Sequence, residues 1–114
     1  MIQKTAKAPE HLRPPTRAWF ESVLNSYALE EHHVKLLTLA AEAWDRGQEA
    51  REVLAKTGLT YNDRFEVPRV RPEVAIERDS RVGFARLLRE LALDVEEPNS
   101  RPPKINGNAS ARRG

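Results

Sequence analysis

The chain has 114 residues, of which 39% are apolar and 32% charged, and its formal net charge is +2 at pH 7. One small domain fits in this length, and small domains bury only a modest fraction of their surface, so we expect the chain to complete its core by self-association. Cysteine is absent, which excludes disulfides and thiolate metal sites and fits a reducing cytoplasm.

The amino-terminal residues 1–14 are expected to form a flexible basic arm. They contain no apolar stretch of signal-peptide length, and no segment of the chain approaches the roughly 18 apolar residues that a membrane span needs. We therefore expect a soluble, intracellular chain that makes no contact with a membrane.

A short first helix is predicted after Pro14 and Pro15, with Thr16 as its N-cap. Apolar side chains then recur at helical spacing from Trp19 to Tyr27. We expect this helix to end near residues 25–27.

The second predicted helix begins near residue 29 or 30 and runs to Lys56, before a C-terminal signal at Gly58. At roughly 1.5 Å per residue it would extend about 40 Å, so it needs a partner along its length. Gly47, in mid-helix, indicates either a tight crossing with another helix or a bend. Two neighbouring apolar lines form a broad stripe: Leu36, Ala40, Ala43, Gly47, Ala50 and Leu54, and beside them Leu37, Ala41 and Trp44.

Residues 58–71 are predicted to form a small β-hairpin or an extended loop, because strand-forming residues flank the turn at Asn62-Asp63-Arg64. Pro68 limits any strand to a few residues. Pro72 suits the first turn of a third helix, which we expect to run to about Leu93. Its predicted buried side chains are Ile76, Phe84, Leu87, Leu88 and Leu91.

The remaining residues 95–114 are poor in large apolar groups and rich in Pro, Gly, Ser and Asn, a composition that predicts a disordered tail. The predicted fold is thus mainly α, with three helices, a long central helix and a hairpin or extended loop before the last helix. Residues 15–94 form its helical domain.

Charge is distributed unevenly along the chain. Residues 30–57 are net acidic, whereas both ends and residues 58–72 are net basic. Such an arrangement lets basic arms and loops meet phosphate while the body faces protein. The alternative is that these charges only keep the surface solvated.

Candidate catalytic and metal-ligating groups do not form a recognisable site. His32 and His33 lie side by side in a predicted helix, and no carboxylate stands at an obvious ligand spacing. Glu77 and Asp79 sit among arginines, so we expect ion pairs with neighbours or with another subunit. No glycine-rich phosphate loop or nucleophile motif is present. We therefore expect no enzyme activity, no cofactor and no metal.

Residues 62–91 resemble the small terminase subunits of tailed double-stranded-DNA phages. The shared features, in order, are the basic turn N-D-R-F, Pro72 at the start of a helix, the core E-R-D-S-R, and the ending F-A-R-L-L-R-E-L. The resemblance continues upstream in A-E-A-W-D-R-G-Q-E-A-R, from Ala41 to Arg51, and covers most of the chain. That family often has a glycine after D-R-F, where this chain has Glu66, and this departure argues against a tight turn there.

The resemblance implies a non-catalytic protein that assembles as a homo-oligomeric ring. It would recognise viral double-stranded DNA at the packaging site, and recruit and regulate the large ATPase-nuclease subunit of the terminase. Residues 15–94 would provide oligomerisation and DNA recognition, and the tail from Glu96 would dock the large subunit. Such a protein acts in the host cell cytoplasm and is not expected in the mature virion.

The candidate site residues fall into two groups. The expected DNA contacts are Lys4, Lys7, Arg13, Arg17, Arg64, Arg69 and Arg71. The expected oligomer interface contains Leu37, Trp44, Phe84 and Leu88.

Two other functions remain open. The main alternative is a helical adaptor or structural oligomer that binds only protein. A weaker alternative is a transcription regulator that uses the first two helices as a helix-turn-helix, but its recognition helix would be net acidic and about twice the usual length.

Overall fold

Three helices and one two-stranded sheet make up residues 7–93, the part of the chain that the computed structural model describes. Their order is α1 (Pro14–Ser26), α2 (Glu31–Thr57), β1 (Thr60–Asn62), β2 (Pro68–Val70) and α3 (Pro72–Glu90). The mainly helical fold, the long central helix and the hairpin are confirmed. The predicted tail over residues 95–114 lies outside the described part.

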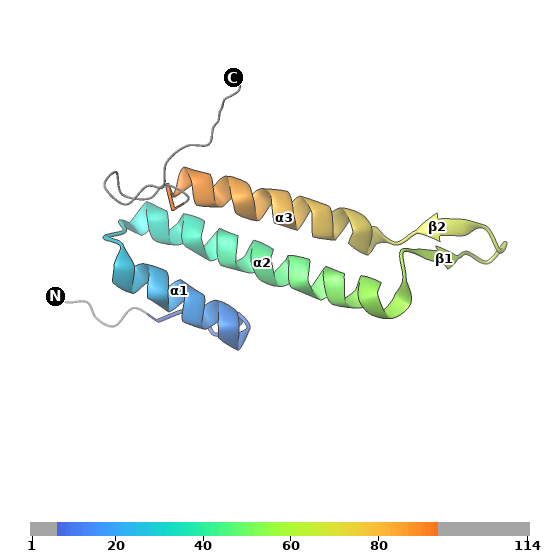
Figure 1. Ribbon diagram of the computed structural model, residues 1–114, viewed down its shortest axis with the longest axis horizontal. Coiled ribbons are helices and arrows are strands. Elements are labelled where there is room, and N and C mark those ends of the chain that lie inside the picture. The colour runs from blue at the N-terminus through green and yellow to red at the C-terminus, as the bar shows by residue number, and fades with distance from the viewer. Residues whose placement is uncertain (1–6, 94–114) are drawn as a thin grey trace, which may run out of the picture.

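The long helix α2 lies between the other two helices, and the hairpin extends beyond the end of the helical body (Figure 1). Within residues 7–93, no helix is long and apolar enough to cross a membrane.

Helices α2 and α3 pack closely along much of their length. Ala40, Gly47 and Ala50 of α2 are buried. A Cβ atom placed on Gly47 would stand only 3.3 Å from the Cβ of Ser80 on α3, a distance that leaves little room for a side chain. Gly47 therefore permits a tight crossing, one of the two roles that its mid-helix position indicates.

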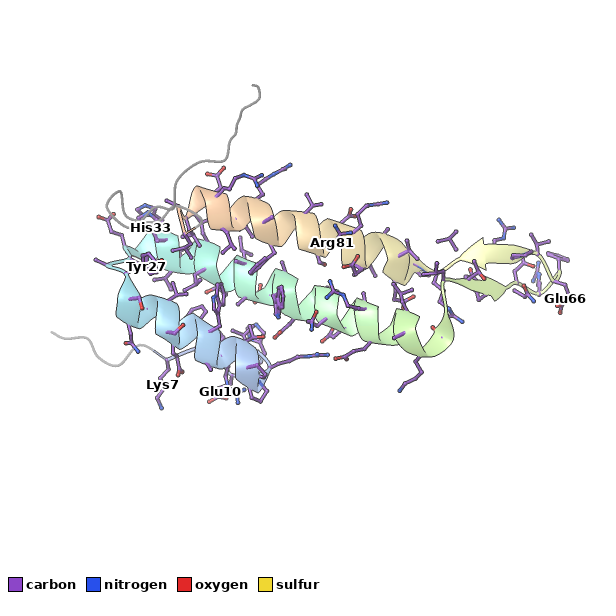
Figure 2. All side chains as sticks on the ribbon, in the orientation of Figure 1. Lys7, Glu10, Tyr27, His33, Glu66 and Arg81 are labelled. Atoms are coloured by element: carbon purple, nitrogen blue, oxygen red, sulfur yellow. The ribbon has the colours of Figure 1, made fainter. Side chains whose placement is uncertain are left out.

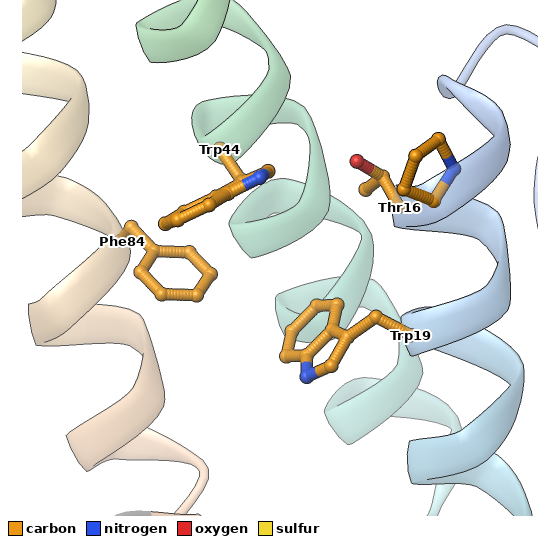
Figure 3. A pocket seen from close by; sticks show the side chains of 5 residues that line it. Thr16, Trp19, Trp44 and Phe84 are labelled. Atoms are coloured by element: carbon orange, nitrogen blue, oxygen red, sulfur yellow. The ribbon is translucent and has the colours of Figure 1, made fainter.

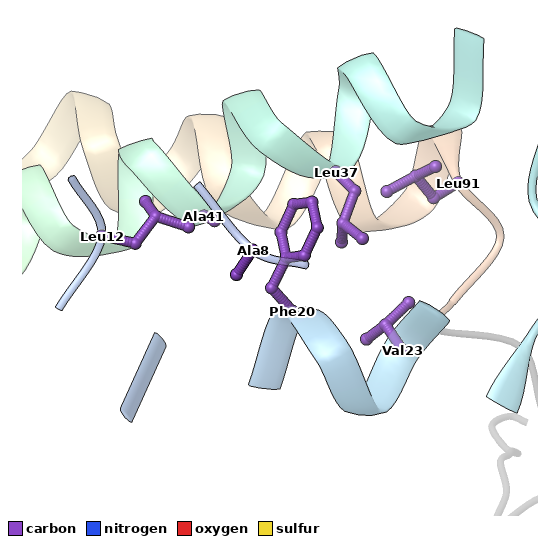
Figure 4. Packing of buried hydrophobic residues seen from close by; sticks show 7 residues of the cluster. All are labelled: Ala8, Leu12, Phe20, Val23, Leu37, Ala41 and Leu91. Carbon is purple, nitrogen blue, oxygen red and sulfur yellow. The ribbon is translucent and has the colours of Figure 1, made fainter. Parts of the chain in front are cut away.

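The hydrophobic core lies at the end of the molecule where α1 covers α2 (Figure 4). It consists of Ala8, Leu12, Phe20, Val23, Leu37, Ala41 and Leu91. Ala8 and Leu12 come from the segment before α1, and Leu12 is only 2% exposed. The prediction of a flexible arm over residues 1–14 is therefore wrong for residues 7–13, because two apolar side chains anchor them in the core. Residues 1–6 lie outside the described part.

Helix α3 has no buried residue, contrary to the predicted burial of Ile76, Phe84, Leu87 and Leu88. The side chain of Ile76 is 38% exposed, and only Leu91, just after the helix, enters the core. The prediction failed because α1 covers only part of α2, so that most of α3 is packed from one side.

The third helix also ends earlier than the predicted position near Leu93. Ala92 has φ +62°, the left-handed conformation that terminates helices. Its N–H donates to the carbonyl of Arg89, and the N–H of Leu93 donates to the carbonyl of Leu88, both at 2.9 Å. These two bonds satisfy carbonyl groups at the end of the helix and turn the chain back toward the core.

Helix α1 receives its cap from α2 rather than from its own sequence. The helix begins at Pro14, so the prediction of Thr16 as N-cap is wrong, and the N-cap residue Arg13 makes no side-chain cap. Instead the Asp45 carboxylate accepts the Arg13 backbone N–H at 2.8 Å and the Thr16 hydroxyl at 2.5 Å. A carboxylate at this end also interacts favourably with the helix dipole.

Because Asp45 is buried, at 8% exposure, we expect Asp45→Ala to lower the free energy of unfolding by about 2 kcal/mol through loss of the cap. The measurement is urea denaturation followed by circular dichroism at a fixed protein concentration. Glu49→Ala, which removes an exposed carboxylate one turn further along α2, is the matched control. Equal midpoints for the two variants would contradict this role of Asp45.

Candidate nucleic-acid interface

The hairpin pairs Thr60 with Val70, Tyr61 with Arg69 and Asn62 with Pro68 in an antiparallel register. Side chains alternate between the two faces of a strand, so Tyr61 and Arg69 share one face. Every residue of both strands is exposed. A two-stranded hairpin is marginally stable by itself, so its turn must supply order.

The carboxylate of Asp63 organises this turn. One oxygen accepts the backbone N–H groups of Phe65 at 2.8 Å and Val67 at 3.0 Å, and the other accepts the Arg69 Nε at 3.0 Å. The Val67 N–H, followed by the Arg69 side chain and the Phe65 N–H, holds the pKa of Asp63 below its ordinary value. The ionised carboxylate is therefore part of the folded hairpin.

The turn is tight although Glu66 occupies the position where a glycine is expected. Glu66 has φ +61°, and its N–H donates to the Asp63 carbonyl at 2.9 Å. Residues other than glycine adopt this conformation at a cost, and the three bonds to the Asp63 carboxylate offset it. The expectation that Glu66 argues against a tight turn was therefore wrong.

Three of the predicted DNA-binding arginines meet on the hairpin. The guanidinium of Arg64 is exposed and lies 4.9 Å from the centre of the Phe65 ring, and within residues 7–93 no acidic side chain pairs with it. Arg69 is held by Asp63. Arg71 lies 5.7 Å from the centre of the Tyr61 ring.

Arg71 also joins the hairpin to the helical body. Its backbone N–H donates to the carbonyl of Leu59 at 2.9 Å, closing the base of the hairpin, and it is the N-cap residue of α3. Its Nε is buried and finds no acceptor in the described part of the chain. Packing over Tyr61, rather than a hydrogen bond, positions this side chain.

The other predicted DNA contacts are not near the hairpin. Figure 2 shows Lys7 beside α1, far from Glu66 at the hairpin tip. Arg13 makes a bidentate pair with Glu52 at 2.8 and 3.0 Å, which raises the pKa of Arg13 and lowers that of Glu52. Arg17 donates to the carbonyl groups of Glu10 and Leu12. Lys4 lies outside the described residues.

In this structure Arg13 and Arg17 thus fasten the segment before α1 to the helices. Lys7 is exposed. The sequence could not show these partners because Glu52 lies far along the chain from Arg13.

An aromatic groove, defined here by Pro15, Thr16, Trp19, Trp44 and Phe84, opens between α1 and α3 (Figure 3). Its volume is about 310 Å³. The ring centre of Phe84 lies 5.7 Å from that of Trp19 and 5.0 Å from that of Trp44, and Trp44 is 44% exposed. The groove therefore presents apolar rings to the surroundings.

The four residues predicted to form the oligomer interface do not lie on one surface. Trp44 and Phe84 line the aromatic groove, and Leu88 is half-buried. Leu37 is completely buried in the core of its own chain. Its prediction as an interface residue is wrong, because α1 and the segment before it already cover this part of α2.

Glu77 and Asp79 of α3 are paired with arginines, as expected. The Glu77 carboxylate accepts bonds from Arg81 and from Arg51 of α2, the latter at 2.8 Å, and Asp79 pairs with Arg78. The bonds from Arg81 and then Arg51 lower the pKa of Glu77. Glu77 thereby links α3 to α2 beside the aromatic groove.

One carboxylate does lie near the paired histidines, which the sequence did not reveal. Single ligand atoms of Glu30, His32 and His33 all lie within 4.8 Å of one another. However, Glu30 and His33 cap the start of α2 reciprocally, which engages the Nδ1 of His33. The positive end of the helix dipole there also disfavours a cation, so capping explains this cluster.

The fold and its exposed residues define a small helical protein with a projecting basic hairpin and an aromatic groove. No family model, curated protein or solved structure matches this chain.

Acid should disorder the hairpin through Asp63. A folded pKa below the ordinary 3.8 means that the contribution of the carboxylate is complete above about pH 4. It is lost as the pH falls through the lower folded pKa. NMR titration of the Phe65 and Val67 amide groups should show this transition.

Asp63→Asn should disorder these amides already at neutral pH, because the uncharged amide is a weaker acceptor than the carboxylate for the two N–H groups and for Arg69. Asp79→Asn removes a carboxylate from exposed α3 and serves as the control. Amide shifts that stay constant from pH 6 to strong acid would refute the role assigned to Asp63.

Proposed function

We propose that this chain is a non-catalytic, homo-oligomeric protein that binds double-stranded DNA through its hairpin. More specifically, we propose that the chain is a small terminase subunit. It would recognise the viral packaging site, and recruit and regulate the large ATPase-nuclease subunit. The observation that carries the DNA-binding proposal is the projecting hairpin with its three arginines. The packaging role rests on the sequence resemblance.

A two-stranded ribbon is one of the two elements that the major groove of B-DNA admits. The hairpin stands clear of the helices (Figure 1), so that it can approach a duplex without a clash with the body. Asp63 restrains Arg69, and Tyr61 underlies Arg71, and this ordering reduces the entropy lost on binding. The exposed charge of Arg64 is available for a phosphate or a base edge.

Self-association would cover apolar surface that the single chain leaves open. Helix α3 buries no residue, and several large apolar side chains of α2 and α3 are more than a third exposed: Leu39, Trp44, Val53, Ile76 and Val82. Contiguous apolar surface marks protein–protein contacts, and two of these side chains, Val53 and Ile76, line one hollow, while Trp44 lines the aromatic groove. A ring would also present many hairpins to one duplex, and weak phosphate contacts gain strength by avidity.

The tail from Glu96, proposed to dock the large subunit, lies outside the described residues. The proposed site of action is the host cell cytoplasm, before the virion matures.

One observation favours the alternative of a protein-only adaptor. The hairpin exposes Leu59, Phe65 and Val70 at 63%, 69% and 66%, and such side chains suit a protein partner as well as DNA. The two functions differ in salt dependence, because only phosphate neutralisation releases counterions.

The double variant Arg64→Ala/Arg71→Ala should bind duplex DNA at least about tenfold more weakly. Its plot of log affinity against log salt should be flatter by about one unit per arginine. Fluorescence anisotropy over a range of salt concentrations measures both. The control Arg46→Ala/Arg78→Ala removes the same charge from exposed positions on α2 and α3 and should change binding little.

Wild-type protein that binds no duplex at low salt would move the assignment to the adaptor. Equal losses in the two double variants would instead show that net charge, and not the hairpin, attracts the DNA.

Assembly should depend on Trp44. Trp44→Asp places a charge in the aromatic groove, where burial against a second copy would be costly, and should shift the particle to monomer in native mass spectrometry. Because Trp44 is 44% exposed, the variant should still fold, which circular dichroism can check. Tyr27→Asp, at 45% exposure, is the control. An unchanged particle mass would remove Trp44 from the interface.

A further inference from the structure

We infer that a segment of the carboxyl-terminal tail, Arg101–Ile105, occupies the aromatic groove in the unassembled chain. The sequence of this segment is R-P-P-K-I. It would compete there with a second copy, so that tail release and assembly are linked. The competition rests on the proposed self-association, whereas the docking itself does not.

The chemistry of the groove selects an extended, proline-containing ligand. Its walls are two indole rings, one phenyl ring and Pro15, with a single hydroxyl from Thr16, and that hydroxyl already donates to Asp45. Aromatic-lined grooves bind proline-rich segments, whose extended conformation is already formed before binding. A volume of about 310 Å³ is also small for a helix, which with its side chains is about 10 Å across.

The tail contains one segment that fits. Among residues 96–114, Ile105 is the only large aliphatic side chain, and Pro102 and Pro103 are adjacent to each other. Apart from Pro98, the other residues of 96–114 are polar, charged, alanine or glycine. The largest apolar side chain and two adjacent prolines thus fall in one stretch of five residues.

The position where the described chain ends makes the contact possible. Leu93 packs against the core, and the turn at Ala92 directs the chain back toward the helices. Phe84 lies nine residues before Leu93, about 14 Å along a helix. Pro102 lies nine residues after it, and an extended chain of that length spans up to about 30 Å. The segment therefore reaches the groove of its own chain without strain.

Docking within one chain also has an advantage over docking between chains. A tethered segment has an effective concentration in the millimolar range, which a second copy does not reach at micromolar protein. In dilute solution the tail of the same chain should therefore occupy the groove. As the protein concentration rises, a second copy should displace it.

The chain provides a specific reporter for this contact. Its only two tryptophans, Trp19 and Trp44, both line the groove, and it has no cysteine. Because the chain has no native cysteine, a nitroxide can be attached at one introduced cysteine alone. Because both tryptophans line the groove, tryptophan emission reports on the groove. The test uses full-length Ser100→Cys, labelled next to the segment, and full-length Ser110→Cys, labelled beyond it, as the matched control.

At concentrations where native mass spectrometry detects only monomer, the label at position 100 should quench tryptophan emission at least about twofold more than the label at position 110, independently of protein concentration. Adding Pro102→Ser/Pro103→Ser to Ser100→Cys should reduce quenching to the level of the control. The same two proline substitutions, without a label, should lower the concentration at which native mass spectrometry detects oligomers.

Equal quenching from the two labels, or quenching that survives loss of both prolines, would overturn the inference. Quenching that grows with protein concentration would assign the occupant to a second copy and would also overturn docking within one chain. Strong, concentration-independent quenching by a chain that never assembles would support the docking and refute only the proposed self-association.

Discussion

The arrangement of the amino-terminal half depends on the buried carboxylate of Asp45. By accepting the N–H of Arg13 and the hydroxyl of Thr16, it fixes the start of α1 on the middle of α2. That contact fixes where Phe20 and Val23 enter the core and places Trp19 opposite Phe84. The aromatic groove therefore exists because one polar contact between helices determines the position of α1.

The carboxyl-terminal half follows a different constraint. Gly47 lets α3 approach α2 closely, and Glu77 links the two helices through Arg51, but within residues 7–93 helix α1 covers only one end of this pair. Apolar side chains are consequently shared between a small core at one end and open surface elsewhere. This distribution accounts for the lack of buried residues in α3. It also suits a chain that covers its exposed apolar side chains by binding partners.

Helix positions and the hairpin could be predicted from the sequence because their signals are local: Pro14 and Pro72 at helix starts, Gly58 at a helix end, and Asp63 in a turn. The errors concern contacts between distant residues. Nothing near Thr16 reveals that Asp45 caps α1, nothing near Leu37 shows that the segment before α1 covers it, and Glu66 adopts a glycine-like conformation only because Asp63 holds the turn. The grouping of Arg64, Arg69 and Arg71 was predictable, whereas the engagement of Arg13 by Glu52 was not.

The connections at the base of the hairpin are very short. Gly58 and Leu59 alone separate α2 from β1, and Arg71 alone separates β2 from α3, while the Arg71 N–H closes the base on the Leu59 carbonyl. Because only these three residues connect the ribbon to the helices, its freedom to swing without unwinding a helix end is small. A bound partner that pulls on the tip of the hairpin would therefore exert a torque on the α2–α3 pair.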